Sequence, residues 1–126
     1  MSKPVLNYNR VAALPALVRC FCFNNEGWVV GSGALWLLNL KDDEPRDYDI
    51  IVPFYQWGNA CRVIPEGSPT NSHGGIKITT DSVKIDVWCG DIGWFFGQVP
   101  ATPAYAVSPK TMTFLSASRD QVRVKK

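Results

Sequence analysis

Apolar positions along the chain follow two spacings, and each spacing predicts a different kind of element. Apolar residues three and four positions apart predict helices, whereas short apolar runs and strict alternation predict strands. The predicted helices cover residues 7–23, 32–40, 54–63 and 91–96. Pro15 interrupts the first of these, and we expect a second helix to begin there. The predicted strands cover residues 28–31, 47–52, 75–80, 82–88, 105–108 and 112–115. From Ser116 onward we expect a terminal helix or tail.

The most informative stretch of the chain is VVGSGALWLLNLKDDEPRDYDIIVP, from Val29 to Pro53. Its first apolar run stops at the Gly-Ser-Gly turn of residues 31–33, and an apolar stretch of helical length follows. Pro45 breaks that stretch before the next apolar run begins, so the order is strand, turn, helix, loop, strand. Backbone N–H groups at the start of a helix attract anions, and the helix dipole adds to this preference. The turn therefore predicts a phosphate site.

Three aspartates in predicted strands need a chemical explanation. If residues 47–52 are extended, Asp47 and Asp49 project from one face, roughly 6.5 to 7 Å apart at the backbone. Two carboxylates at that separation can converge on one cation, and without a cation they repel, so that one or both tend to hold a proton. The third acid, Asp86, lies in the middle of a strand of β-branched residues. We therefore expect Asp86 to have a chemical role, since an acid in that position is unlike an ordinary solvated surface residue.

These features together resemble the DNA polymerase beta-like nucleotidyltransferase superfamily. The Gly-Ser turn that opens a helix, the Asp-x-Asp at the head of the next strand and the third aspartate on a later strand carry the resemblance, which covers roughly Trp28 to Trp88. It implies an α/β (α+β) fold in which helices flank a mixed twisted β-sheet. Residues 1–126 would form one such domain, as in a minimal member of the superfamily.

The resemblance also implies roles for particular residues. Gly31 and Ser32 would hold the phosphates of a nucleoside triphosphate such as ATP. Asp47 and Asp49 would bind divalent metal ions, and Asp86 would complete the metal site. The expected metal is Mg²⁺ or Mn²⁺. These three aspartates are therefore the candidate catalytic residues.

The implied reaction moves a nucleoside monophosphate from the triphosphate to an acceptor hydroxyl and releases pyrophosphate. The acceptor stays open between an RNA end, a protein side chain and a small molecule. Only about 40 residues follow Asp86. Selectivity for the base would therefore come from loops of this domain, from another copy of the chain in a homo-oligomer, or from a separate protein partner. Lys77 or Lys84 is a candidate cation beside the phosphates.

Two other interpretations are compatible with the same residues. In the first, the chain is a non-catalytic binding module that keeps the fold and acts through a protein partner. The candidate surface of that module consists of four aromatic residues, Tyr55, Trp57, Trp94 and Phe95. In the second, the acids are ordinary surface residues. Asp47 and Asp49 would then pair with Arg46 or Lys41 and bind no metal.

Composition and charge indicate a globular protein and give no sign of a membrane span. At 126 residues, with 46% hydrophobic and 19% charged residues, the chain is expected to fold as one globular domain. A net charge of +2 is too small to indicate a nucleic-acid partner by itself. No signal peptide and no apolar run of the roughly 20 residues that a membrane span needs are visible, so we expect a cytoplasmic protein with no membrane partner.

The four cysteines do not have the spacing of a common zinc site. Cys20 and Cys22 form a Cys-x-Cys pair, and Cys61 is distant from them in the sequence. All three lie among apolar residues. We therefore expect buried free thiols in a reducing compartment.

Overall fold

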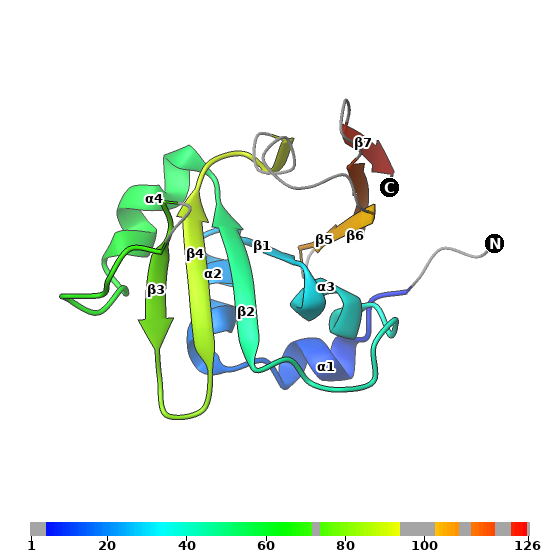
Figure 1. The fold of residues 1–126 in the computed structure, drawn as a ribbon, viewed down its shortest axis with the longest axis horizontal. Coiled ribbons are helices and arrows are strands. Elements are labelled where there is room, and N and C mark those ends of the chain that lie inside the picture. The colour runs from blue at the N-terminus through cyan, green and yellow to red at the C-terminus, as the bar shows by residue number, and fades with distance from the viewer. Residues whose placement is uncertain (1–4, 72–73, 94–102, 109–111, 118–121, 126) are drawn as a thin grey trace.

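The computed structural model describes residues 5–71, 74–93, 103–108, 112–117 and 122–125 (Figure 1). Its helices are α1 (Tyr8–Ala12), α2 (Ala16–Asn24), α3 (Ser32–Leu37) and α4 (Phe54–Cys61). Its strands are β1 (Trp28–Val30), β2 (Asp47–Val52), β3 (Ile76–Thr79), β4 (Lys84–Cys89), β5 (Pro103–Val107), β6 (Met112–Ala117) and β7 (Val122–Lys125). This alternation confirms the predicted α/β class.

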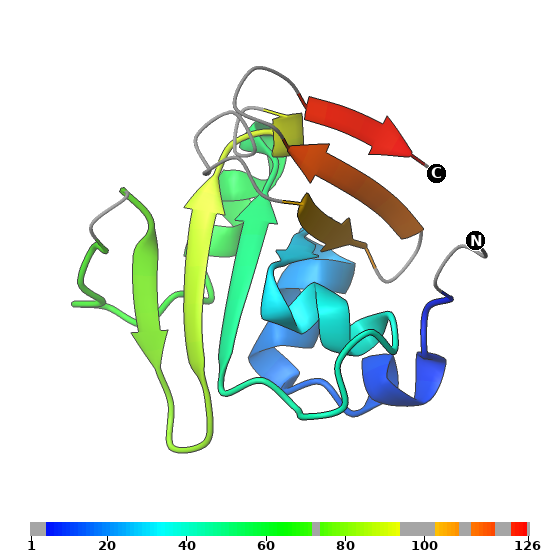
Figure 2. The ribbon, with the colours of Figure 1, turned by 45° about the vertical axis from the view of Figure 1, so that its right-hand side comes forward.

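The seven strands form one mixed sheet in the order β3-β4-β2-β1-β5-β6-β7. β2 and β4 are parallel, and every other neighbouring pair is antiparallel. The chain leaves β2, passes through α4 and the edge strand β3, and returns as β4 beside β2. Figure 2 shows β5, β6 and β7 running at a steep angle to β2, as expected for a strongly twisted sheet.

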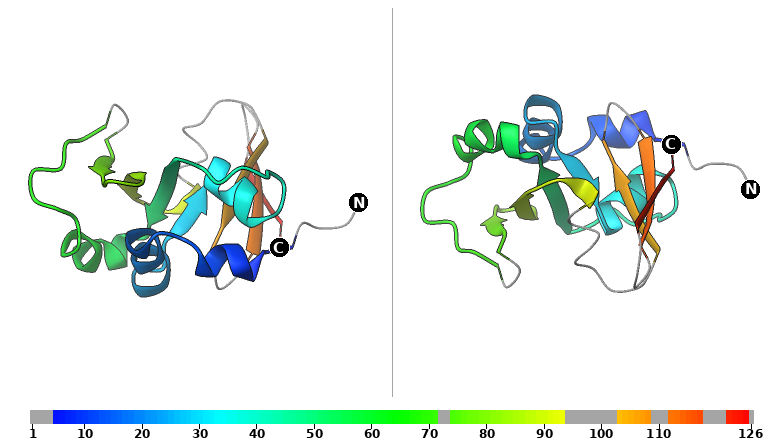
Figure 3. Two further views of the ribbon diagram at one scale, coloured as in Figure 1. Left: turned by 90° about the horizontal axis from the view of Figure 1, so that it is seen from below. Right: turned by 90° about the horizontal axis from the view of Figure 1, so that it is seen from above.

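Helices cover one face of the strands β3, β4 and β2. Figure 3 shows α2 and α4 on the same side of these strands. The side chains that meet them are fully buried, and they alternate along the strands with more polar positions. This core face includes Tyr48, Ile50, Val52, Ile78, Ile85 and Val87. The opposite face of the same strands carries the acidic residues described below.

Proline and asparagine set the boundaries of the first two helices. The side chain of Asn7 accepts a hydrogen bond from the Arg10 N–H at 3.1 Å, so Asn7 is the N-cap of α1. α1 ends at Ala12, and Pro15 stands immediately before α2. Pro15 lacks an N–H and fixes its φ near the helical value, which suits the start of a helix and not its interior. The predicted break at Pro15 is confirmed.

α3 ends three residues earlier than its apolar pattern predicts. Asn39 has φ 60°, and its N–H donates to the Trp36 carbonyl at 3.2 Å. The Leu40 N–H donates to the Leu35 carbonyl at 2.9 Å. These two bonds form a Schellman motif, with Asn39 in the left-handed position that glycine usually takes. An apolar pattern does not report such a stop, because the residues beyond it stay apolar.

The C-terminal segment corrects one prediction. We expected a helix or tail from Ser116 onward, but β6 continues to Ala117, and β7 pairs with it antiparallel over residues 122–125. The alternation of valine with basic residues in VRVK is typical of an edge strand with one apolar face. The predicted strands near 105–108 and 112–115 are confirmed as β5 and β6, whereas residues 94–96, the second half of the predicted helix over 91–96, lie outside the described residues.

All four cysteines are free thiols. Cys22 is buried as expected, and its burial raises the pKa of its thiol to about 12. Cys61 lies at the end of α4 and is exposed, so the expectation of a buried thiol was wrong there. Within the described ranges, no helix has the length and apolar character that crossing a membrane requires.

Candidate active site

Strand register places the three aspartates on one face of the sheet. In the parallel pair β2–β4, Asp49 lies opposite Asp86, and Asp47 lies opposite Lys84. Residues that are partners in register point to the same face, and so do residues two apart on a strand. Asp47, Asp49 and Asp86 therefore share the face that α2 and α4 leave uncovered. A register slip of one residue in β4 would have turned Asp86 into the core.

The three acids differ in exposure. Asp47 at the start of β2 is exposed, whereas Asp49 and Asp86 are half-buried. Burial, and after it the negative charges of Asp86 and Asp47, together raise the pKa of Asp49 from 3.8 to about 6. A salt bridge to a cation would have lowered this pKa. The raised value therefore speaks against a pairing of Asp49 with Arg46 or Lys41.

The Gly-Ser-Gly turn lies beside Asp49. Val30, the last residue of β1, is the register partner of Asp49. A Cβ added to Gly31 would lie 3.4 Å from Asp49 Oδ2, and Gly31 has φ 68°, a conformation that side chains with a Cβ rarely adopt. Glycine thus lets the backbone turn sharply against the carboxylate. The structure brings the predicted phosphate turn and the predicted metal ligands together.

Gly33 has a packing role that the sequence did not reveal. A Cβ at this position would lie 2.8 Å from Val29 Cγ1 and 3.0 Å from Tyr48 Cδ1. Both of these partners are buried side chains of the core face. Only glycine lets the first turn of α3 lie this close to β1 and β2, and that contact positions the Gly31-Ser32 turn.

Sequence reasoning missed Asn71, which contacts Asp86 directly. The Asn71 side-chain amide donates to Asp86 Oδ1 at 3.1 Å. The sequence predicts no helix or strand between the elements at 54–63 and 75–80, but the segment before Asn71 pairs with the edge of β3 through a bridge between Thr70 and Ile76. An asparagine ahead of a Gly-Gly pair is a signal for a turn built on its side chain. That signal could have singled out Asn71, but the sequence does not indicate that its partner is Asp86 on β4.

The two candidate cations lie on the acid face. Lys77 is the register partner of Asp86, and Lys84 is the register partner of Asp47; both are exposed. Next to Asp47 the surface forms an open hollow of about 550 Å³ at the turn between β3 and β4. Its lining is mostly polar and consists of Arg46, Asp47 and residues 79–84. Basic groups thus flank the acids from the side of the edge strand.

The donor set fits a divalent cation by its chemistry. Carboxylate oxygens are the ligands that Mg²⁺ and Mn²⁺ prefer. The pKa of Asp49 is raised by burial and by repulsion from Asp86 and Asp47, and a cation would relieve that repulsion. In the part of the chain that the structure describes, no three Asp, Glu, His or Cys side chains already form a closed metal-binding cluster. The three carboxylates share one face of the sheet, and they would have to converge to hold a metal ion together.

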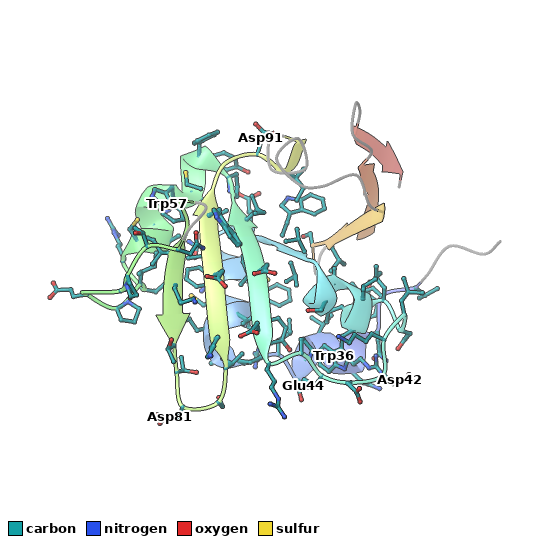
Figure 4. All side chains as sticks on the ribbon, viewed as in Figure 1. Trp36, Asp42, Glu44, Trp57, Asp81 and Asp91 are labelled. Atoms are coloured by element: carbon teal, nitrogen blue, oxygen red, sulfur yellow. The ribbon has the colours of Figure 1, made fainter. Side chains whose placement is uncertain are left out.

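Of the four aromatic residues considered for a partner surface, the structure describes two, and both lie on α4. Tyr55 is 73% exposed on α4, whereas Trp57 packs against the core (Figure 4). Trp94 and Phe95 lie outside the described residues. Two other tryptophans do lie on the acid face, because Trp28 and Trp88 are the register partners of Ile51 on either side of β2. They form a largely apolar row beyond Asp49 and Asp86.

Two solved structures are similar to this chain. The Thermotoga maritima CCA-adding enzyme complexed with tRNA has a TM-score of 0.55 and 18% sequence identity, over 89% of this chain and 32% of that one. A CCA-adding enzyme in complex with CTP has a TM-score of 0.54 and 16% identity, over 89% of this chain and 31% of that one. The fold is nucleotidyltransferase-like.

At these identities the similarity shows the fold alone, and the chain spans about a third of the length of either enzyme. The mixed sheet flanked by helices is similar to the fold of these nucleotidyltransferases, so the predicted fold class is confirmed. The sequence matches no protein-family model, and no curated protein matches it significantly. The roles of the individual site residues stay predictions.

Proposed function

We propose that this chain is a metal-dependent nucleotidyltransferase. It would move a nucleoside monophosphate from a nucleoside triphosphate to an acceptor hydroxyl and release pyrophosphate. The observation that carries the proposal is the register of Asp49 with Asp86 beside the Gly31 turn. Three carboxylates and a turn of backbone amides then face the same space on a nucleotidyltransferase-like fold.

Asp47, Asp49 and Asp86 would hold Mg²⁺ or Mn²⁺. When bound, the divalent ion supplies positive charge that stabilises the negative charge of the transferring phosphate. The half-buried Asp49 has a pKa near 6 without a metal. It therefore holds a proton in mildly acidic solution and ionises near neutral pH, where its oxygens become available as ligands. The site is thus expected to bind metal more weakly below pH 6 than above it.

The turn at the start of α3 would hold the phosphates of the nucleotide. The first N–H groups of any helix have no partner within the helix, so they can donate to phosphate oxygens. α3 has only six residues, and its dipole adds correspondingly little. The amides and the Ser32 hydroxyl would therefore do most of the binding. Lys77 and Lys84, on the same face, are candidates for additional charge beside the phosphates.

The acceptor and the nucleotide are open within this proposal. The two similar structures are complexes with tRNA and with CTP, so RNA ends and CTP belong among the first substrates to test, together with ATP and the other nucleoside triphosphates. We further propose that residues 1–126 act as a single nucleotidyltransferase domain. Base and acceptor selectivity would then come from its loops, from a second copy, or from a protein partner.

A second candidate function is a binding module that keeps the fold without catalysis. Phe54 and Tyr55, at the start of α4, are 67% and 73% exposed. They lie on a helix that covers the face opposite the acids (Figure 3). A partner docked on these residues would not touch the acid face, so the two functions can be separated by experiment.

Thermal unfolding with ligands tests the proposal. Mg²⁺ or Mn²⁺ together with a nucleoside triphosphate should raise the Tm of the wild type. The double variant Asp47→Asn/Asp49→Asn should show no such increase, whereas Asp42→Asn, an exposed loop acid (Figure 4), should behave as wild type. A binding module would show no increase in any of the three proteins. The acceptor class is then identified by incubating the protein with Mg²⁺, each labelled nucleoside triphosphate and a cell extract, and by determining which molecule gains label.

A further inference from the structure

We propose that Asn71 is a positioning residue for the metal site. Its side-chain amide occupies one oxygen of Asp86 and leaves the other oxygen for a divalent cation. This inference rests on the proposed function, because it takes Asp86 as a metal ligand. It adds a residue that the predicted ligand set does not contain, from a segment whose sequence indicates only a loop.

The hydrogen bonds of Asn71 fix the orientation of its amide. Nδ2 donates to Asp86 Oδ1 at 3.1 Å, and Oδ1 accepts from the Gly75 N–H at 2.8 Å. The two ends of an asparagine amide differ, since the nitrogen only donates and the oxygen only accepts. The Gly75 N–H requires the oxygen end, so the N–H₂ end must face the carboxylate. Asn71 can therefore present only a donor to Asp86.

The backbone around Asn71 is also held in place. The Asn71 N–H donates to the Gly75 carbonyl at 2.8 Å, and the Lys77 N–H donates to the Pro69 carbonyl at 2.8 Å. Together with the bridge between residues 70 and 76, these bonds attach the segment to the outer edge of β3. The side chain of Asn71 thus emerges from paired backbone and not from a free loop, so little entropy is lost when it binds Asp86.

Gly75 makes this arrangement sterically possible. It is buried, and a Cβ added there would lie 2.5 Å from Trp88 Nε1 and 2.7 Å from Asn71 Nδ2. Both distances are shorter than real Cβ contacts allow. The absence of a side chain at Gly75 therefore creates the space in which the Asn71 amide lies, between the Trp88 indole and Asp86.

A neutral donor at this position suits the charge of the site. Asp86 faces Asp49 across neighbouring strands, where the backbones are about 4.8 Å apart, and two like charges at such a distance turn away from each other. A hydrogen bond to one oxygen limits the rotation of the Asp86 carboxylate, and it adds no positive charge that would compete with the metal. Hydrogen bonds to ligating carboxylates are typically worth about ten- to a hundredfold in metal affinity or activity.

The test measures Mn²⁺ binding to the full chain by calorimetry, without nucleotide. The variants are Asn71→Ala and Asn71→Ser, neither of which carries an amide donor. The matched control is Asn59→Ala, which removes an exposed asparagine of α4 on the other face of the sheet. Circular dichroism and the Tm of the metal-free proteins report whether each variant folds.

We expect the Asn71 variants to raise the Kd for Mn²⁺ by about ten- to a hundredfold, with Asn59→Ala within twofold of the wild type. Higher Mn²⁺ should restore the nucleotide-dependent increase in Tm. An unchanged Kd in a folded Asn71 variant would overturn the inference. So would tighter binding, since Asn71 would then hold Asp86 away from the metal, and so would unfolding of both variants, which would make Asn71 a structural residue. A wild type that binds no Mn²⁺ would overturn the proposed function itself and this inference with it.

Discussion

Replacing Asp49 by asparagine should stabilise the metal-free protein at neutral pH. Asp49 is half-buried beside two other carboxylates, and its pKa is raised to about 6. A folded-state pKa above the unfolded value means that folding favours the protonated form. The stabilising effect of that proton is fully present below pH 4 and is lost as the pH rises through 6. Above pH 6, the ionised Asp49 therefore opposes folding.

The size of the effect follows from the pKa. The difference between 3.8 and about 6 corresponds to about 3 kcal/mol of free energy of unfolding at a pH well above both values. Because part of the Asp49 side chain reaches solvent, screening lowers this to about 1–2 kcal/mol. Asparagine has nearly the same shape and no charge. For a chain of this length, Asp49→Asn should then raise the Tm by about 3–8 °C.

The assay is thermal unfolding in EDTA between pH 4 and pH 8, for the wild type, Asp49→Asn and the exposed loop variant Asp42→Asn. The advantage of Asp49→Asn should be near zero at pH 4, should grow between pH 4 and pH 6.5, and should then stay constant. Asp42→Asn should follow the wild type. If Asp49→Asn had the same Tm as wild type at pH 7.5, or the same advantage at every pH, the electrostatic account of the acid face would be wrong.

Four further substitutions test activity and packing. Asp86→Ala should abolish nucleotidyl transfer and leave the circular dichroism spectrum unchanged; full activity in this variant would show that Asp86 is not a ligand. Ser32→Ala should raise the KM for the nucleoside triphosphate more than it lowers kcat, and an unchanged KM would contradict its phosphate role. Gly33→Ala should lower the free energy of unfolding by about 1–3 kcal/mol because its Cβ would overlap the core face of the sheet. Gly58→Ala in α4, where a Cβ meets nothing within 4 Å, should instead raise it by about 0.5–1 kcal/mol; chemical denaturation distinguishes the two.

Local sequence signals predicted most of the fold. The apolar spacing gave α2, α3, α4 and the strands from β1 to β4, and Pro15 marked the break between the first two helices. Their exact ends depended on specific hydrogen bonds instead. The Schellman motif at Asn39 ends α3 although Leu40 is apolar, and β7 forms because β6 offers it an edge. Neither the hydrogen bonds of that motif nor the pairing of β7 with β6 can be recognised from the local apolar pattern.

The candidate site likewise has a part that the sequence predicts and a part that depends on how the strands pair. Asp47 and Asp49 are on one face because alternation along a strand requires it, and the sequence alone predicts this. That Asp86 lies beside Asp49 depends on β4 returning parallel to β2, in one register, after β3 has taken the outer edge. Periodicity contains no information about that order, and only the resemblance to a known superfamily pointed to it. The roles of Asn71 and Gly33 depend on contacts that exist only once the strands are paired.

Under the proposed function, the acid face is a site for chemistry that lowers the stability of the metal-free protein. Burial and the charges of Asp86 and Asp47 raise the pKa of Asp49, and a sheet selected for stability alone would place a neutral residue there. The helical face of the same strands carries no charged group among its fully buried side chains, although the Tyr48 hydroxyl is buried there with no hydrogen-bond partner among the described residues. Both faces are made by the same alternation in β2 and β4. The repulsion among the acids is confined to the face that the helices leave open, and it lies where the Gly31 turn meets Asp49. A bound cation would relieve this repulsion. A purely structural role for the acids would not explain why they are placed together.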